Sequence, residues 1–158
     1  MRIRAATLGD EQRSAVLNGF VQSLHTANRP DHFKASTLAE VANWFRAFLQ
    51  NASARTWIAE EEGTAVGYTL AIVQERPESS LCHARRWCEI DQIAVDPSFR
   101  RKAIASALMR KAVLSAAADG IVEVELCTCA FNEQAQVTFR RLGFVPKILL
   151  WELRSGSR

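Results

Sequence analysis

The hydrophobic positions in the first third of the chain recur at helical spacing. Val16, Phe20 and Leu24 lie four residues apart, which predicts an amphipathic helix with these side chains on one face. A second helix is expected to begin after Thr37, because Glu40 follows at the spacing of a capping box. The buried stripe of this second helix is predicted to consist of Leu38, Val41, Phe45 and Leu49.

The period then changes to the alternation that is typical of strands. Alternating segments occur at the start of the chain, on both sides of Glu62-Gly63, and in "RWCEIDQIAV", "IVEVELCTCAF" and "FVPKILLWEL". Two further helices separate the last three strands, with Gly120 and Gly143 as helix stops. The predicted order is β-α-α-β-β-β-α-β-α-β. Strands joined by helices late in the chain predict an α/β (α+β) fold with a mixed sheet.

Length and composition predict one soluble domain. The chain has 158 residues, 48% of them hydrophobic, which suffices for one core. No linker or repeat is visible, so we expect one domain over residues 1–153 and a flexible tail over residues 154–158. No apolar run approaches the roughly 20 residues of a membrane span. Because no secretory signal is visible either, we expect a cytoplasmic protein without a membrane partner.

The four cysteines are Cys82, Cys88, Cys127 and Cys129. In a cytoplasmic protein they are most simply reduced thiols. A zinc site that also uses His83 is an alternative, but the usual C-x2-C spacing is absent, so no metal is predicted. Cys127 and Cys129 are two residues apart on a predicted strand and are expected to pack in the core.

A strand, a basic turn and a helix follow one another between Val95 and Val113. The turn carries Arg100, Arg101 and Lys102, and the first amides of a helix have no partner within it. Such a turn suits a phosphate group, although a solvated basic turn explains the same residues equally well. The net charge of +3 is compatible with a small anionic ligand or with nucleic acid.

This turn and a later motif together resemble the GNAT superfamily of N-acetyltransferases. In that family the pattern R/Q-x-x-G-x-G/A opens a helix, and here it falls on Arg100–Ala105. The family's second motif falls on Asn132, Ala135, Phe139, Gly143 and Phe144. The resemblance is strongest over residues 88–145. It implies a mixed, mostly antiparallel central sheet of about six strands with helices on both faces.

The resemblance implies transfer of an acetyl group from acetyl-coenzyme A to a primary amine by direct attack in a ternary complex. The turn would bind the pyrophosphate. The end of the preceding strand would hydrogen-bond the pantetheine arm through its main chain, because the next strand is expected to diverge. The implied acetyl-coenzyme A contacts are Ile93, Ala94, Val95, Arg100, Arg101, Lys102, Ala103, Ile104, Ala105, Ser106, Asn132, Ala135 and Phe139.

Two positions depart from the family pattern. Ala103 stands where the family prefers glycine, which costs little unless the position needs a positive φ or the methyl crowds the ligand. Phe139 stands where many members have a tyrosine that protonates the departing thiolate, and phenylalanine has no such proton. The chain's single tyrosine, Tyr68, lies in an earlier strand.

Two acidic residues are the candidates for a general base. Glu89 and Asp91 are two apart on a strand, so they are expected to share a face. By its distance from the turn, Glu89 matches the glutamate that some family members use as base. The alternative is that both acids are solvated or pair with Arg85 and Arg86.

Other candidates also have a plain structural explanation. Asn132 is placed to cap a helix as well as to contact the cofactor. Cys127 is expected to be packed rather than nucleophilic, because nothing nearby is seen to lower its pKa. Residues that could line an acceptor pocket, or simply be surface and core residues, are His25, Asp31, His32, Phe33 and Trp44.

Two other functions stay open. A non-catalytic module that binds or senses acyl-coenzyme A is consistent with the departures at Ala103 and Phe139. An RNA-binding module is less consistent, because the arginine pairs are scattered and lack an aromatic stacking motif, so no nucleic-acid partner is predicted. The acceptor amine is not readable from the sequence. A homodimer through the C-terminal strand is a hypothesis.

Overall fold

The computed structural model describes residues 1–155. The chain divides into two compact units, one of residues 1–127 and one that begins at Thr128. The single domain expected over residues 1–153 stays a prediction. Most of the predicted tail, residues 156–158 of 154–158, lies outside the described residues.

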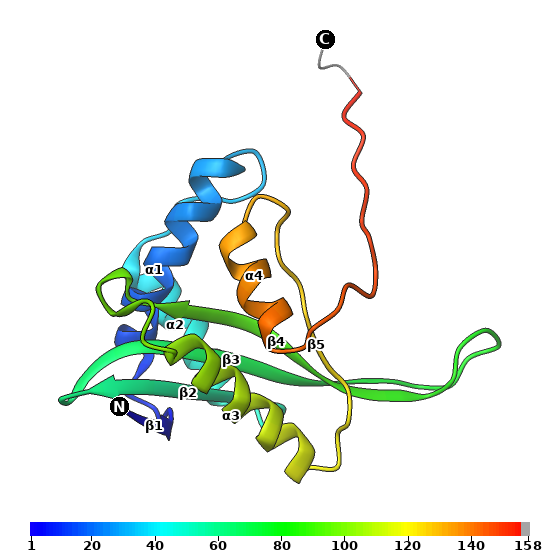
Figure 1. Ribbon diagram of the computed structural model, residues 1–158, viewed down its shortest axis with the longest axis horizontal. Helices are drawn as coiled ribbons and strands as arrows, with labels where there is room; N and C mark the ends of the chain where they lie inside the picture. The colour runs from blue at the N-terminus through cyan, green and yellow to red at the C-terminus, as the bar shows by residue number, and fades with distance from the viewer. Residues whose placement is uncertain (156–158) are drawn as a thin grey trace. The chain divides into compact units, whose positions relative to one another are not determined.

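The first unit is built on one five-stranded sheet whose strands lie in sequence order. Neighbouring strands are antiparallel, except that the last pair, β4 and β5, is parallel. The sheet is therefore mixed and mostly antiparallel, as predicted. Its strands (Figure 1) are β1 (Arg2–Ala5), β2 (Ala54–Glu61), β3 (Thr64–Arg76), β4 (Arg85–Val95) and β5 (Val124–Leu126).

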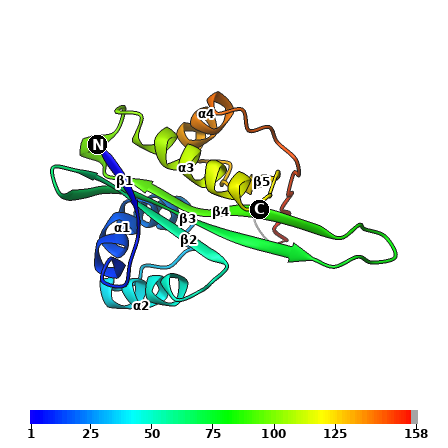
Figure 2. The same cartoon turned by 90° about the horizontal axis from the view of Figure 1, so that it is seen from below.

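Helices cover both faces of this sheet, as predicted. Figure 2 shows α1 and α2 on one face and α3 on the other. On the α1 and α2 side, a buried core forms around Phe45, Ile58, Tyr68 and Leu70. The helices of this unit are α1 (Glu11–Asn28), α2 (Leu38–Leu49) and α3 (Ile104–Ala118), with a short 3-10 turn η1 (Pro97–Phe99) before α3.

The predicted capping box of α2 is present. The Thr37 backbone N–H donates to Glu40 Oε2 at 2.7 Å, and the Glu40 N–H donates to Thr37 Oγ1 at 3.3 Å. The predicted stripe of this helix is only partly buried, because Phe45 is fully buried whereas Leu38 is 48% exposed. The first residue of the helix was thus easier to predict than which of its side chains are buried.

The prediction for α1 was wrong about which face packs on the sheet. Val16, Phe20 and Leu24 are exposed by 53%, 37% and 41%. The buried residues of this helix are Glu11, Ser14, Ala15, Leu17 and Asn18. Hydrophobic periodicity missed this face because two of its polar residues, Glu11 and Asn18, have polar partners in other elements, which the sequence pattern does not reveal.

The second unit contains one helix, α4 (Glu133–Arg141), followed by an extended segment. Gly143 ends the helix with φ 91°, as predicted. The strand predicted for "FVPKILLWEL" is absent, since residues 144–150 and the rest of that segment form no strand in the described chain. The sheet has five strands instead of about six for this reason: a strand forms only where a second strand pairs with it.

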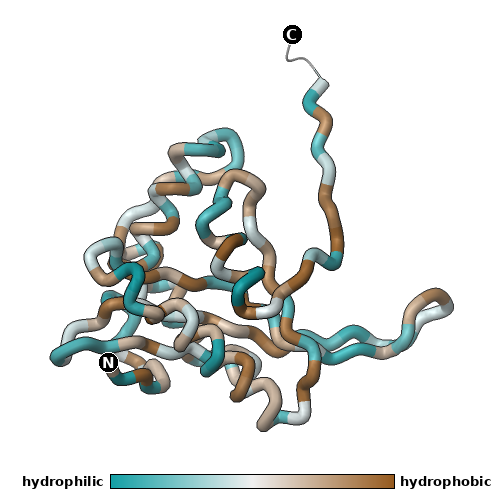
Figure 3. Tube along the Cα trace, viewed as in Figure 1, coloured by the Kyte–Doolittle hydropathy of each residue, from teal (hydrophilic) through white to brown (hydrophobic). Residues whose placement is uncertain are grey.

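Figure 3, in which the trace is coloured by hydropathy, shows a hydrophobic run in this extended segment. Its large apolar side chains are 71–97% exposed. The expectation that Cys127 and Cys129 pack in the core was also wrong: Cys127 is exposed and Cys129 is half-buried. All four cysteines are free thiols.

Candidate functional site

The outer edge of β4 is free over its last five residues. Parallel pairing with β5 joins Cys88, Glu89 and Ile90 to Val124–Leu126 and ends there. From Asp91 to Val95, β4 therefore has β3 on one side and no strand on the other within the described residues. Backbone groups at Ile93, Ala94 and Val95 thus lie on the part of the β4 edge that follows the end of the β5 pairing.

A β-bulge lies at the start of this opening. Leu70 of β3 pairs with Gln92, but Ala71 pairs with Ile90, so Asp91 is an extra residue in β4. Regular alternation is broken at this point. Glu89 shares its face with Gln92, and the expectation that strict alternation places Glu89 and Asp91 together does not hold across the bulge. Bulges bend a strand and occur often beside active sites.

The two candidate bases lie in different environments. Gln74 Nε2 donates to Glu89 Oε2 at 3.0 Å, and Glu89 is half-buried. Asp91 is exposed when its whole solvent-accessible surface is considered. Protein atoms around its carboxylate still desolvate this group, and the desolvation raises the pKa of Asp91 above its usual value. A hydrogen bond with the Gln92 side chain acts in the opposite direction.

Neither acid pairs with the two arginines that were considered as alternatives. Arg85 Nη2 donates to Glu123 at 2.5 Å and also to Glu125 on β5. Arg86 Nε lies 3.0 Å from Glu75 Oε1. The alternative in which Arg85 and Arg86 neutralise the candidate bases is therefore wrong, and these ion pairs hold β3, β4 and β5 together instead.

A buried polar network lies next to the bulge, and the sequence analysis missed it. Asn18 Nδ2 donates to Tyr68 Oη at 3.0 Å and to Gln92 Oε1 at 3.2 Å. Tyr68 is fully buried. Burial raises the pKa of Tyr68 well above its usual range; the Asn18 hydrogen bond lowers it, and the charge of Asp91 raises it further. The phenol is therefore neutral at any physiological pH.

The buried face of α1 contains a second polar group near Asn18. Ser14 is one turn earlier in the helix, is fully buried, and its hydroxyl has no hydrogen-bond partner in the described part of the chain. The signal that could have identified this face was the four-residue spacing of Ser14 and Asn18, with acidic residues Asp10 and Glu11 one turn before. Polar residues at that spacing form a stripe of their own.

The turn before α3 has left-handed backbone at two positions. Arg101 has φ 63° and Ala103 has φ 59° with ψ 13°. Ala103 therefore occupies a position with a positive φ, where an alanine is strained. This strain costs the folded state roughly 1–2 kcal/mol relative to a right-handed conformation. The turn ends where α3 begins, and the N–H groups of Ile104, Ala105 and Ser106 have no partner among residues 1–155. Free amides at the start of a helix are groups that can bind an anion.

The three cations of the turn are not equivalent. Lys102 Nζ lies 3.4 Å from Glu61 Oε2 and 4.8 Å from the centre of the Phe99 ring. Arg100 and Arg101 are exposed and form no ion pair with the residues that the structure describes. Two guanidinium groups therefore remain available to an anion beside the helix terminus, whereas the lysine is held by the β2–β3 hairpin.

Gly67 lets α3 approach the sheet closely, a role that the sequence analysis did not identify. A Cβ at Gly67 would lie 3.0 Å from the Ala94 carbonyl oxygen and 3.2 Å from Ile104 Cγ2. Ile104 is itself buried. The glycine thus fixes the start of α3, and with it the free amides, against the end of β4.

The remaining predicted cofactor contacts lie on α4 in the second unit. Asn132 Oδ1 accepts a hydrogen bond from the Ala135 N–H at 3.3 Å, so Asn132 is the predicted N-cap. Phe139 is 9% exposed, and its ring centre lies 6.3 Å from that of Phe144. Both observations concern α4 itself, and the cofactor contacts of these residues stay predictions.

Three of the five predicted acceptor residues, His25, His32 and Phe33, form a small aromatic cluster at the end of α1. The rings of His25 and Phe33 stack at 4.6 Å, and His32 contacts Phe33 edge-on at 4.7 Å. Burial lowers the pKa of His25, which favours its neutral form. Trp44 does not join this cluster, since it packs on Phe48 at 4.5 Å within α2.

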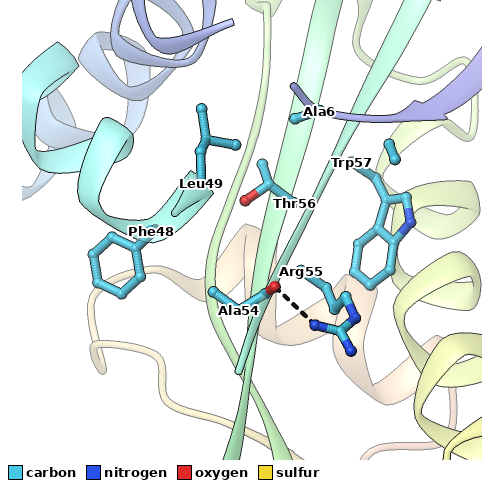
Figure 4. Close-up of a pocket in the computed structure, with 8 residues that line it drawn as sticks. Ala6, Phe48, Leu49, Ala54, Arg55, Thr56 and Trp57 are labelled. Carbon is cyan, nitrogen blue, oxygen red and sulfur yellow. Dashed lines mark hydrogen bonds between the residues drawn. The ribbon is translucent and has the colours of Figure 1, made fainter. Parts of the chain in front are cut away.

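A cavity of about 120 Å³ lies at the end of α2 and beside β2 (Figure 4). It shares no residue with the turn, the bulge or the acceptor cluster. Arg55 is its only charged side chain, and this guanidinium donates to the Ala54 carbonyl oxygen at 3.1 Å. We therefore assign the chemistry to β4 and the turn, and not to this cavity.

Among residues 1–155 there is no cluster of three or more His, Cys, Asp or Glu side chains that could hold a metal ion. Among the same residues, every helix is too short or too polar to cross a bilayer.

Comparisons with solved structures show the same fold at low sequence identity. A tetramutant of the BH1408 protein from Bacillus halodurans has a TM-score of 0.93 at 23% identity, over 98% of this chain and 100% of that one. The aminoglycoside N-acetyltransferase AAC(6')-Iy in complex with CoA has a TM-score of 0.75 at 20% identity, over 99% and 95%. A predicted acetyltransferase from Clostridium acetobutylicum with acetyl-CoA has a TM-score of 0.73 at 18% identity, over 97% and 95%.

No curated protein sequence matches the chain significantly. A family model does match. The model of the acetyltransferase (GNAT) family covers residues 20–144, which is well over half of the chain and includes the bulge, the turn and α4. The free edge of β4 and the anion-binding start of α3 fit its cosubstrate, acetyl-coenzyme A. This chain therefore belongs to the acetyltransferase (GNAT) family.

Proposed function

We propose that this protein is an N-acetyltransferase that moves the acetyl group of acetyl-coenzyme A to a primary amine by direct attack in a ternary complex. One observation carries the proposal: β4 has a free edge from Asp91 to Val95, and that edge leads into the turn at the start of α3. An extended ligand arm and a terminal pyrophosphate need these two features in this order.

The cosubstrate would be held mainly by backbone groups. Ile93, Ala94 and Val95 would hydrogen-bond the pantetheine arm as if it were an added strand. The free amides of Ile104, Ala105 and Ser106 would bind the pyrophosphate, with Arg100 and Arg101 supplying full charges. The family resemblance further implies cosubstrate contacts for Asn132, the N-cap of α4, and for Ala135 and Phe139 within α4.

Asp91 and Glu89 would act as general base, directly or through water. Transfer needs a neutral amine, and an acid with a raised pKa accepts a proton more readily near neutral pH. The raised pKa of Asp91 and its place in the bulge support it as the first candidate. Glu89 is the second candidate, and its carboxylate is already engaged by Gln74.

The names of two similar structures support N-acetylation as the class of reaction. AAC(6')-Iy and AAC(6')-Ig from Acinetobacter haemolyticus are both aminoglycoside N-acetyltransferases. At 16–20% identity the similarity concerns the fold, so the acceptor amine of this chain is left to experiment. We expect the reaction to take place in the cytoplasm.

A thiol-release assay with acetyl-coenzyme A and a panel of amines tests the proposal. Amine-dependent release of coenzyme A, with an acetylated amine identified by mass spectrometry, is the expected result. Tight cofactor binding without turnover on any amine would instead favour a module that senses acyl-coenzyme A. In that case Phe139, which lacks the tyrosine proton, gives the physical reason.

Asp91→Asn and Glu89→Gln assign the base. If Asp91 is the base, Asp91→Asn lowers kcat/KM by about 10²–10⁴-fold and removes the acidic limb of the pH–rate profile. Glu89→Gln keeps the hydrogen bond with Gln74 within reach and serves as the matched control. The reverse pattern of losses would assign the role to Glu89.

A further inference from the structure

Asp91 is the extra residue of the bulge, and strand pairing does not fix its side chain. It has no register partner in β3, where Leu70 pairs with Gln92 and Ala71 pairs with Ile90. The pairing of β4 with β5 also ends before it, at Ile90. A group that takes part in a reaction must be held within about 0.5 Å of its productive position by neighbouring groups. Side-chain contacts therefore have to position this carboxylate.

The next residue along β4 supplies such a contact. The side chain of Gln92 forms a hydrogen bond with the Asp91 carboxylate. An ionised carboxylate only accepts hydrogen bonds, so the donor is Gln92 Nε2. The other end of the same amide, Gln92 Oε1, accepts a hydrogen bond from Asn18 Nδ2 at 3.2 Å. Because the two bonds use opposite ends of one planar amide, the bond from Asn18 turns the donor of Gln92 toward Asp91.

Asn18 is itself held on the buried face of α1. It is 7% exposed, and its Nδ2 also donates to Tyr68 Oη at 3.0 Å. Its neighbours Ala15 and Leu17 pack in the core of the first unit. Titratable groups on the surrounding elements are neutral or already bonded to other side chains: Tyr68, Glu11, Glu89 and Glu125. The packed helix therefore fixes the place of Asn18, and Asn18 fixes the amide that contacts Asp91.

We propose that Asn18 and Gln92 are positioning residues for the Asp91 carboxylate: Asn18 orients the amide of Gln92, and Gln92 Nε2 holds one oxygen of Asp91. The inference rests on the proposed function, in which Asp91 is the first candidate for the general base. Asn18 acts only through Gln92, so the effect of its removal should depend on the presence of the Gln92 amide.

This arrangement gives the two carboxylate oxygens of Asp91 different tasks. One oxygen accepts the hydrogen bond from Gln92, which favours the ionised form of the group. The other oxygen takes a proton from the ammonium form of the acceptor, directly or through water. That transfer leaves a neutral amine and a neutral carboxylic acid, so the opposite charges cancel. Without the Gln92 donor, the carboxylate is harder to ionise and its plane is no longer fixed.

A carbon-13 NMR titration of the Asp91 carboxyl group in the full chain tests the contact without turnover. Asp91→Asn identifies the signal by its loss. Gln92→Leu keeps the size of the side chain and removes the donor, so it should raise the pKa of Asp91. Gln92→Glu keeps an oxygen for Asn18 but adds a negative charge, so it should raise this pKa further. Asn18→Leu frees the amide instead of removing it and should raise the pKa less than Gln92→Leu does.

Thr69→Val is the matched control for a loss of structure. Thr69 is fully buried, and its hydroxyl donates to the main-chain carbonyl oxygen of Gln92 at 3.0 Å. Its replacement removes a buried hydrogen bond to the same residue but leaves the Gln92 side chain in place. We expect Thr69→Val to lower stability in urea unfolding and to leave the titration of Asp91 unchanged.

The same variants are then compared in the thiol-release assay as a function of pH. Gln92→Leu should lower kcat/KM at pH 7 by roughly 10-fold or more and move the acidic limb of the profile to higher pH. Asn18→Leu should cause a smaller loss with the same direction of shift. The double variant should lose no more than Gln92→Leu alone, and Thr69→Val should keep the limb in place.

The two measurements separate this inference from the proposed function. An Asp91 titration that is the same in the unchanged protein, Gln92→Leu and Gln92→Glu would overturn the inference, even where Asp91→Asn abolishes turnover. Additive losses of kcat/KM in the double variant would also overturn it. Shifted titrations in a protein that turns over no amine would support the contact between Gln92 and Asp91 and count against the proposed function alone.

Discussion

α3 and α1 both contact β4, and they bury different sets of side chains. α3 buries Ile104, Leu108, Met109 and two alanines against one face of the sheet. α1 buries Ala15 and Leu17 together with the polar residues Glu11, Ser14 and Asn18 against the other face. The buried face of α3 is therefore apolar, whereas that of α1 mixes apolar and polar side chains.

The difference teaches how each helix is positioned. Apolar packing is not directional, so α3 is held by volume and by the close approach at Gly67, which sets the anion-binding terminus. α1 adds directional bonds to the apolar packing of Ala15 and Leu17, since Asn18 reaches both Tyr68 and Gln92 at the bulge. A buried polar group left without its hydrogen-bond partner is costly, so removal of Asn18 should have specific consequences.

The largest expected effect concerns the start of α1. Asp10 is almost fully buried, and Arg4 lies 2.8 Å and Arg13 2.9 Å from its carboxylate. We expect Asp10→Ala to lower the free energy of unfolding by about 3–5 kcal/mol at pH 7, because two charges lose a buried partner. Urea unfolding measures this. The matched control is Asp31→Ala, whose exposed pair with Arg29 should contribute about 0–1 kcal/mol.

The effect of Asp10 should depend on pH in a defined direction. The hydrogen bond from Arg4 holds the pKa of Asp10 well below its usual range, although burial opposes this. A carboxylate whose pKa is lower in the folded state stabilises fully above its unfolded pKa of about 3.9 and loses this contribution as the pH falls. The difference between the unchanged protein and Asp10→Ala should therefore be constant from pH 7 to about pH 5 and shrink below it. A difference that grows on acidification would contradict the assignment.

The next effect tests the apolar side of the comparison. Leu108 is fully buried in the middle of α3. Leu108→Ala should cost about 2–5 kcal/mol through lost burial and the cavity left behind. Leu114, on the same helix, is 66% exposed, and Leu114→Ala should stay within about 0.5 kcal/mol. Equal losses for the two variants, measured by thermal or urea unfolding, would show that α3 is not packed as described.

A smaller effect is expected for the polar side. Asn18→Ala leaves the Tyr68 hydroxyl and the Gln92 side chain without their donor, which should cost about 1–3 kcal/mol in urea unfolding. Adding Tyr68→Phe to Asn18→Ala removes the hydroxyl that has lost its hydrogen-bond donor. In a double-mutant cycle this second substitution should recover part of the lost free energy of unfolding. Asn28 is exposed at the end of the same helix, and Asn28→Ala is the control that should stay within about 0.5 kcal/mol. Strictly additive losses would mean that Asn18 and Tyr68 do not interact.

The smallest effect concerns the left-handed residue before α3. Ala103→Gly should stabilise the protein by about 1 kcal/mol, because glycine adopts a positive φ without strain. Coenzyme A should bind as tightly or several-fold more tightly by calorimetry. Ala105→Gly, two residues later and inside the helix, should destabilise by about 0.5–1 kcal/mol. Opposite signs for these two substitutions are the expected result, and a shared sign would rule out strain at Ala103.

The sequence predicted the features that depend on neighbouring residues. The capping box of Thr37 and Glu40, the cap at Asn132 and the left-handed stop at Gly143 are all present. These signals are local, because each needs a few residues at a fixed spacing. The turn at Arg100–Ala105 and the motif at Asn132 also sufficed for the family, since two spaced motifs are more specific than one.

The features that the sequence did not predict depend on partners far along the chain. The bulge at Asp91 exists only in the register between β3 and β4, and no single strand contains that information. The buried polar face of α1 follows from Tyr68 and Gln92, which lie 50 and 74 residues from Asn18. The prediction of a C-terminal strand was wrong because a strand forms only when its backbone groups hydrogen-bond to a second segment.

The sequence by itself therefore determined the four helices, the caps at Thr37 and Asn132, the order of elements as far as α4, the basic turn and the family. Only the tertiary structure decided which face of α1 is buried, where β4 loses its partner, and that Ala103 occupies a left-handed position. The physical reason is the sequence separation of the residues that interact. Caps and turns are fixed by contacts within one helical turn of sequence, whereas burial, strand register and a free sheet edge are set by residues brought together from different parts of the chain.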